Sequence, residues 1–384
     1  MKYLAILLLP LVTLLACDQK QPQNNAQGTG VSLHAELGGS ADGFERACDT
    51  RVFDFPADHA AHPSFRNEWW YVTGNLENES GRRFGFHITF FRIANEPTLS
   101  ADETDHQLSN WSSKQFYMAH FAVSTEGEEI KTYERFSRAA AGLAGAEAHE
   151  NKVVKVWLDD WQLYALQSDA QLQWHLSLKE QDLNLDLTLT AEKPLVLQGD
   201  AGYSRKSADA CNASYYYSFT RLKASGSLDF NISDQAVSHS VSGSAWLDRE
   251  WSSSALGANQ SGWDWFALQL SDGRDIMLYQ LRNKDGSRDS YSHAVEIDQH
   301  GNATVIPIED IDIEITRWWQ SDVGNSYPVA GEIHRQDTNE TIVFKPLIDN
   351  QLLDLTVRYW EGAISLTDTD HNAIGHGYME LTGY

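Results

Sequence analysis

The sequence predicts an all-β protein built from antiparallel strands. Beyond residue 60, short runs of β-favouring or alternating residues are separated by turn residues at short spacing, which is typical of barrels and sandwiches. Helical signals are scarce: the Ala- and Glu-rich stretch 139–150 is interrupted by Gly142 and Gly145, so a loop or one short helix is expected there. A chain of 384 residues is long enough for two such domains.

The expected strands follow one another as hairpins and a meander. Three pairs flank turn-rich tetrads, namely Glu68–Glu77 with Arg82–Ala94, Trp263–Leu270 with Asp275–Arg282, and His293–Asp298 with Ala303–Pro307. The meander comprises Lys152–Leu163, Leu172–Leu178 and Leu183–Leu189, and further strands begin at Thr341, Leu353 and Gly362. Within Leu183–Leu189, leucine alternates with polar residues, which indicates a strand with one solvent-facing side.

The N-terminus resembles a bacterial lipoprotein signal. Lys2 precedes an apolar run over 4–15, which is too short to span a membrane but suits a signal-peptide core. The run ends in Leu14-Leu15-Ala16-Cys17, which resembles a lipobox. We therefore predict cleavage before Cys17 and lipid on that cysteine; an ordinary secretory signal is the alternative. The expected location is the cell envelope, with the protein anchored to a membrane and facing the periplasm, and the choice of inner or outer membrane stays open.

Composition suggests four segments and excludes one class of partner. We predict a signal peptide at 1–16, an acylated cysteine with a flexible tether at 17–43, an N-terminal domain at 44–250 and a C-terminal domain at 251–384. Acidic residues outnumber basic ones 54 to 29, for a net charge of −25. Such a surface repels nucleic acid and anionic headgroups, so lipid on Cys17 must supply the membrane attachment. Whether Cys48 and Cys211 form a disulfide stays open.

Common catalytic signatures are missing from the sequence. It contains no G-x-S-x-G, H-E-x-x-H, P-loop or G-x-G-x-x-G motif. His149-Glu150 begins like a zinc-binding helix, but Val153 and Val154 follow where the second histidine is required. We therefore expect neither a metal nor a cofactor.

Carboxylates beside tryptophans are the clearest chemical signal. On a strand, the stretch 245–251 (AWLDREW) places Trp246, Asp248 and Glu250 on one face. Neighbouring carboxylates flanked by indoles can raise the pKa of one of them, so that it holds a proton near neutral pH. The alternative is a buried salt bridge between one of these carboxylates and an arginine: Arg249, Arg92 or Arg221. Aromatic residues form 11% of the chain, which suits core filling, a pocket for an extended apolar ligand, or both.

Six ordered stretches together resemble the carotenoid 1,2-hydratase / AttH-like family. They are EWWYVTGNL (68–76, preceded by His62-Pro63), FGFHITFFR (84–92), AWLDREW (245–251), GWDWFALQL (262–270), YWEG (359–362) and GYMELTGY (377–384). The resemblance implies two tandem lipocalin-like (calycin-type) antiparallel β-barrels, a fold that can enclose one small ligand. In the hydratase branch it also implies that Asp248 is the proton donor, although Trp246 stands where those enzymes tend to have tyrosine.

Two functional hypotheses from different classes follow. The first is a membrane-anchored lipocalin-like lipoprotein that binds an apolar ligand, such as a lipid, an isoprenoid or a polyene; the family resemblance adds a membrane transporter as a partner. The alternative is a hydratase-like enzyme, a hydro-lyase that hydrates or isomerises an alkene by acid catalysis, and a secreted hydrolase is a third reading. The candidate catalytic residues are Asp248 and Glu250, and the candidate ligand-binding residues are Trp246, Trp70, Tyr217, His62 and Trp265.

Overall fold

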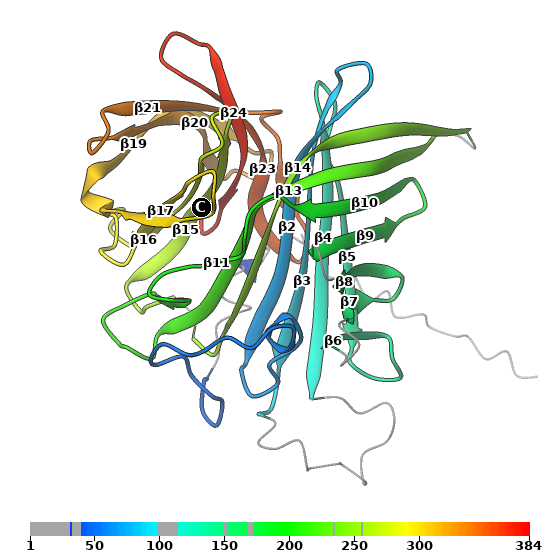
Figure 1. Cartoon of the computed structure of the whole chain (residues 1–384), viewed down its shortest axis with the longest axis vertical. Helices are drawn as coiled ribbons and strands as arrows, with labels where there is room; N and C mark the ends of the chain where they lie inside the picture. The colour runs from blue at the N-terminus through cyan, green and yellow to red at the C-terminus, as the bar shows by residue number, and fades with distance from the viewer. Residues whose placement is uncertain are drawn as a thin grey trace, which may run out of the picture.

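The computed structural model describes residues 31–32, 40–97, 114–148, 153–167, 172–232, 235–254 and 256–384. Within these ranges the protein is almost entirely β, in two large sheets that each curl around an apolar core (Figure 1). The helical segments are two short 3-10 turns, Ala57–His59 and Ile308–Asp310. The predicted all-β class with two lipocalin-like antiparallel barrels is confirmed.

The first sheet is formed by strands β2 to β14 in the order β5-β4-β3-β2-β14-β13-β10-β9-β8-β7-β6, with β11 and β12 added beside β13. Its strands are β2 (Asn67–Asn78), β3 (Arg83–Ala94), β4 (Gln115–Thr125), β5 (Lys131–Arg138), β6 (Ala144–Ala148), β7 (Val153–Leu158), β8 (Trp161–Gln167), β9 (Leu172–Lys179), β10 (Leu183–Ala191), β11 (Val196–Leu197), β12 (Tyr203–Arg205), β13 (Ala213–Ile232) and β14 (Gln235–Ser252).

The second sheet is formed by strands β15 to β24 in the order β18-β17-β16-β15-β24-β23-β21-β20-β19. Its strands are β15 (Gln260–Leu270), β16 (Asp275–Asn283), β17 (His293–Ile297), β18 (Ala303–Ile306), β19 (Ile311–Gln320), β20 (Ser326–Arg335), β21 (Glu340–Pro346), β22 (Leu352–Asp354), β23 (Val357–Thr367) and β24 (Ala373–Leu381). β22 pairs with β23, and β1 (Val31–Ser32), which falls within the predicted tether, pairs parallel to β23.

Each barrel is filled by the side chains that alternate to its inside. In β10, Leu183, Leu185, Leu187 and Leu189 are buried in the first core while the residues between them are more exposed, as the leucine alternation predicts. A separate apolar core fills the second barrel. A third cluster, which includes Tyr71, Tyr216, Trp246 and Trp265, joins residues of both sheets. The outer faces of the two barrels therefore pack on each other.

The predicted hairpins are confirmed, but three elements differ from expectation. The strand expected to begin at Gly362 begins at Val357, as β23. The stretch 152–163 is not one strand, because a turn at Asp159 and Asp160 divides it into β7 and β8. The stretch 139–150, expected to be a loop or a short helix, contains strand β6, which pairs with β7. Pairing with a distant strand overrides the local preference of Ala and Glu.

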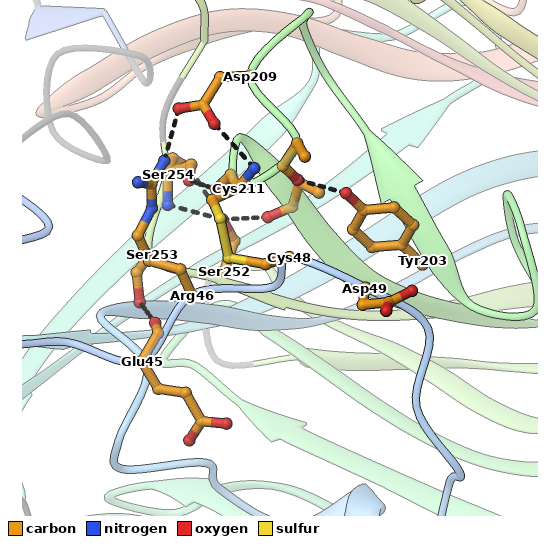
Figure 2. The surroundings of a disulfide bond; sticks show 12 residues. Glu45, Arg46, Cys48, Asp49, Tyr203, Asp209, Cys211, Ser252, Ser253 and Ser254 are labelled. Carbon is orange, nitrogen blue, oxygen red and sulfur yellow. Dashed lines mark hydrogen bonds and ion pairs between the residues drawn. A yellow bond between two sulfur atoms is a disulfide. The ribbon is translucent and has the colours of Figure 1, made fainter.

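Cys48 and Cys211 form a disulfide, which the sequence left open (Figure 2). It joins the segment before β2 to the loop before β13. The same loop is held to the end of β14, because the hydroxyl of Ser254 donates to the carbonyl of Cys211 at 2.8 Å (Figure 2). The disulfide thus fastens the N-terminal segment close to the passage from the first sheet to the second.

The predicted signal peptide and Cys17 lie outside the described residues. Neither 3-10 turn in the described ranges has the length or apolar character of a membrane-spanning helix.

Candidate functional site

A cavity lies between the two barrels and outside the core of either one. It leaves about 120 Å³ for the centres of water-sized molecules. Side chains of β2, β3, β13 and β14 line one side, and side chains of β15, β16, β23 and β24 line the other. The aromatic part of the lining includes Trp69, Tyr71, Tyr216, Trp263, Trp265 and Tyr359. Such a concave, mainly aromatic site with a few polar groups is typical of small-molecule binding.

Asp248 is the carboxyl group at the centre of the first sheet's side of the cavity. Its side chain is buried, and its oxygens accept hydrogen bonds from the Ser218 hydroxyl (2.5 Å), the Trp246 indole nitrogen (2.6 Å) and the Tyr216 hydroxyl. Burial raises the pKa of Asp248 to about 7, against the opposing effect of these three donors, and the charge of Glu250 adds to the increase. Asp248 is therefore a carboxylic acid for part of the time at neutral pH.

The arginines proposed as alternative partners are all engaged elsewhere. Arg249 and Arg92 both pair with Glu68 inside the first barrel, and Arg221 pairs with Asp275 at 2.6 Å. Within the described part of the chain, no basic side chain forms an ion pair with Asp248. The buried salt bridge considered for Asp248 is therefore not formed.

Glu250 differs from Asp248 because it has a cationic partner. The amine of Lys206 lies 3.2 Å from the Glu250 carboxylate, and both side chains line the cavity. Burial acts to lower the pKa of Lys206, but the neighbouring Glu250 carboxylate acts against it and the pKa is raised. The two carboxyls of β14 thus have different environments, one without a counter-ion and one with it.

The second sheet contributes two further carboxyls, Glu361 on β23 and Glu380 on β24. They are cross-strand partners, and both line the cavity. Burial raises the pKa of Glu380 to about 8, with Glu250 and Asp248 adding to the effect. Burial, followed by the charge of Glu380, raises the pKa of Glu361 well above its usual range. These residues lie far from Asp248 in sequence, and only the packing of the two barrels brings them together.

Two buried histidines of the first sheet, on β3 and β4, contact tyrosines of the second sheet. His120 Nδ1 lies 2.8 Å from the Tyr359 hydroxyl and its Nε2 lies 3.0 Å from the carboxylate of Glu134. His87 Nδ1 lies 3.2 Å from the Tyr378 hydroxyl, and burial lowers its pKa well below the usual range. Neutral imidazoles therefore orient the tyrosines of β23 and β24.

The structure brings some of the predicted site residues together and separates others. Asp248, Glu250 and Trp265 line the cavity, and Trp246 packs edge-on against Trp265 with 6.2 Å between ring centroids. Trp70 and Tyr217 belong to the first barrel's core. His62 stacks on Trp251 there, with ring centroids 3.9 Å apart. Trp70, Tyr217 and His62 therefore lie outside the cavity lining.

Four polar groups of the cavity were not predicted from the sequence: Tyr216, Lys206, Glu361 and Glu380. Both glutamates occur in strands whose neighbouring residues are apolar, YWEG and YMEL. A carboxyl at such a position signals that the second face of the strand is also covered. A group of three His, Cys, Asp or Glu side chains able to hold a metal is not found in the ranges that the structure describes.

Comparisons with known proteins agree with this architecture. The family model described as AttH-like matches residues 46–384. An AttH protein of Nitrosomonas europaea, known from its crystal structure, is 34% identical, with a TM-score of 0.74, over 89% of this chain and 100% of that one. Kievitone hydratase of Nectria haematococca is 14% identical, with a TM-score of 0.58, over 89% of this chain and 98% of that one. It therefore shares the fold. No curated protein sequence matches. The chain belongs to the AttH-like family.

Proposed function

We propose that this protein binds an apolar small molecule in the cavity between its barrels and adds water to a carbon–carbon double bond of that molecule, with Asp248 as the proton donor. The observation behind the proposal is a fully buried carboxyl with a pKa of about 7 in a cavity of aromatic rings. A pKa near the working pH suits a general acid. The hydratase activity named for the fungal protein of the same fold supports this reaction class.

The reaction needs a proton donor, a site that tolerates a carbocation and a proton acceptor. Asp248 transfers its carboxyl proton to one alkene carbon, and the positive charge that forms on the other carbon faces the rings of the lining, such as Trp265 and Tyr216. Water adds to that carbon, and the proton it releases returns to the Asp248 carboxylate. The charge of Glu250, the ion-pair partner of Lys206, favours the protonated form of Asp248 before each cycle.

The test is mass spectrometry of the molecules that co-purify with the protein from its native host. Wild type is compared with Asp248→Asn and with a control, Asp264→Asn, whose carboxylate pairs with Arg282 away from the cavity lining. If an alkene co-purifies with Asp248→Asn and its hydrated form co-purifies with wild type and with the control, the result supports hydration catalysed by Asp248. The same molecule in all three samples would identify a carrier instead, and the catalytic role of Asp248 would be wrong.

We also propose that lipid on Cys17 holds the protein on a membrane facing the periplasm. The lipobox-like sequence before Cys17 and the net charge of −25, which disfavours direct contact with anionic headgroups, support this. The test is labelling of growing cells with radioactive palmitate, followed by fractionation. Wild type should be labelled and should fractionate with the membrane. Cys17→Ala and Cys17→Ser should do neither. An unlabelled wild type would contradict the proposal.

A further inference from the structure

The carboxyls of Glu361 and Glu380 have no part in the proposed proton transfer, yet they are placed in the same cavity. Directly opposed residues of an antiparallel pair have Cβ atoms about 4.5–5.5 Å apart and project from the same face of the sheet. Glu361 and Glu380 are such a pair. Glu361 is only 1% exposed.

No cation balances this pair. In the part of the chain that the structure describes, neither glutamate forms an ion pair with lysine or arginine, and the basic group in contact with Glu361 is His87, whose Nε2 lies 3.5 Å from Glu361 Oε2. Burial keeps the pKa of His87 well below its usual range, so this imidazole is neutral. Two adjacent carboxylates, one buried and one partly buried, do not both ionise without a counter-charge. At least one of the two is therefore a carboxylic acid, which can donate a hydrogen bond.

Three buried polar atoms of this corner have no hydrogen-bond partner among the described residues: Glu361 Oε1, the hydroxyl oxygen of Tyr71 and His87 Nε2, and the first two belong to residues of the cavity lining. The side chains of Glu361 and Tyr71 are close enough for a polar interaction that affects the pKa of both, but neither of these two oxygens has a partner in good hydrogen-bonding geometry. An unsatisfied buried polar group is costly, and an oxygen atom of a ligand placed between these two would satisfy both.

We propose that Glu361 and Tyr71 form a subsite for a neutral oxygen-bearing group of the ligand, a carbonyl or a hydroxyl, which accepts a hydrogen bond from the Glu361 carboxylic acid. This inference rests on the proposed function in that it places the ligand in the same cavity. The ligand is then an apolar molecule with two distinct ends. Its oxygen lies against the second barrel, and its double bond lies against Asp248 on the first.

Charge selects against other ligand classes. Four carboxyls line the cavity, namely Asp248, Glu250, Glu361 and Glu380, and the amine in the lining, Lys206, is already paired with Glu250, so an anionic ligand finds no unpaired cation among the lining residues. An organic cation is the competing class, because carboxylates and aromatic faces both attract cations. A cation, however, would have to lose its own hydration. It would also have to drive the ionisation of carboxyls that are themselves shielded from water. A neutral acceptor requires neither step.

The experiment is calorimetric titration of the purified protein at pH 7 with three probes of nearly the same shape. These are 2-acetylnaphthalene, which offers a carbonyl, 2-isopropylnaphthalene, which offers none, and 1-(2-naphthyl)ethylammonium, a cation. We expect the ketone to bind about tenfold more tightly than the hydrocarbon, as one hydrogen bond to an otherwise unsatisfied buried donor provides, and the cation to bind most weakly. None of the probes carries an isolated alkene, so the result does not depend on catalysis by Asp248.

Two variants assign the preference to Glu361. Glu361→Gln keeps a hydrogen-bond donor and should keep most of the preference for the ketone. Glu361→Leu has no donor and should bind ketone and hydrocarbon equally. Equal binding of these two probes by wild type, or tightest binding of the cation, would overturn the inference and leave the proposed binding cavity intact. Failure of all three probes to bind would contradict both the inference and the cavity.

Discussion

Asp248 and Arg249 are neighbours in sequence, but their side chains leave β14 on opposite faces. Asp248 lines the cavity between the barrels, whereas Arg249 lies in the first barrel, where it pairs with Glu68 and covers the ring of Trp70 at 3.9 Å. The two-residue period of a strand enforces this separation. As a result the candidate acid is kept away from the nearest cation in sequence, whose charge would lower its pKa.

Replacing Tyr216 by Phe should raise the pKa of Asp248 further. The Tyr216 hydroxyl donates to the Asp248 carboxylate, so its loss removes an interaction that favours the charged form. A hydrogen bond to a charged group is worth about 1.5 kcal/mol or more, which corresponds to an increase of about one pKa unit. Titration of the carboxyl carbon of Asp248 by ¹³C NMR measures this change.

The matched control is Tyr215→Phe. The Tyr215 hydroxyl donates to the backbone carbonyl of Asp49, away from the cavity lining, at 3.1 Å. The pKa of Asp248 should not change in this variant. An unchanged or lowered pKa in Tyr216→Phe would show that the Tyr216 hydroxyl does not stabilise the carboxylate.

The raised pKa of Asp248 should also appear in the pH dependence of stability. Between about pH 4 and pH 7 the folded protein keeps a proton on Asp248 that the unfolded chain has lost, so the free energy of unfolding falls as the pH rises through this window and then levels off. The loss is on the order of a few kcal/mol. Asp248→Asn has no titrating group at this position and should gain stability relative to wild type as the pH rises from about 4 to about 7.

Urea unfolding of both proteins at several pH values provides the measurement. Glu361 and Glu380 also have raised pKa values, with the same sign of effect, and they are present in both proteins. Asp248 is one of the smaller causes of the raised pKa of Glu380, so Asp248→Asn removes that small contribution as well. If the two stability curves ran parallel, Asp248 would titrate alike in the folded and unfolded states, and its role as an acid near pH 7 would fail.

Replacing Glu68 by Gln should destabilise the first barrel strongly. Glu68 is fully buried and pairs with both Arg92 and Arg249, so the variant leaves two buried guanidinium groups without a counter-charge. Removing one partner of a buried ion pair costs about 3–5 kcal/mol, measured as the free energy of unfolding in urea. The control is Asp349→Asn, which removes the partner of Arg317 in an exposed pair; a change below about 1 kcal/mol is expected there. Equal effects in the two variants would contradict this account.

Breaking the Cys48–Cys211 disulfide should lower the free energy of unfolding by about 3–5 kcal/mol. The bond joins residues 163 positions apart, and closing so long a loop restricts the unfolded chain. Urea unfolding with and without reductant measures the effect in wild type. The Cys48→Ser/Cys211→Ser variant serves as the control, because it should have the lower stability and no response to reductant. A wild type that does not respond either would show that the bond does not stabilise the fold.

The sequence was informative wherever the structure depends on neighbours along the chain. Alternation assigned Asp248 and Glu250 to one face of β14, and the turn-rich tetrads located the hairpins. It was less informative where pairing is distant. The strand β6 forms because β7 lies beside it, although its own residues favour a helix.

The all-β class and the two faces of each strand could be predicted from the sequence, because the alternation of side chains is a local property of the backbone, and the family could be predicted from its ordered motifs. That the outer faces of the two barrels meet could be learned only from the folded molecule. That contact buries Asp248 in the same cavity as Glu361 and Glu380, which are more than a hundred residues away in sequence. Trp70, Tyr217 and His62 lie on the inner side of the first barrel and so do not reach the cavity. Burial and electrostatic coupling depend on which surfaces come together in space, and these are the effects that raise the pKa of a carboxyl and create a candidate acid.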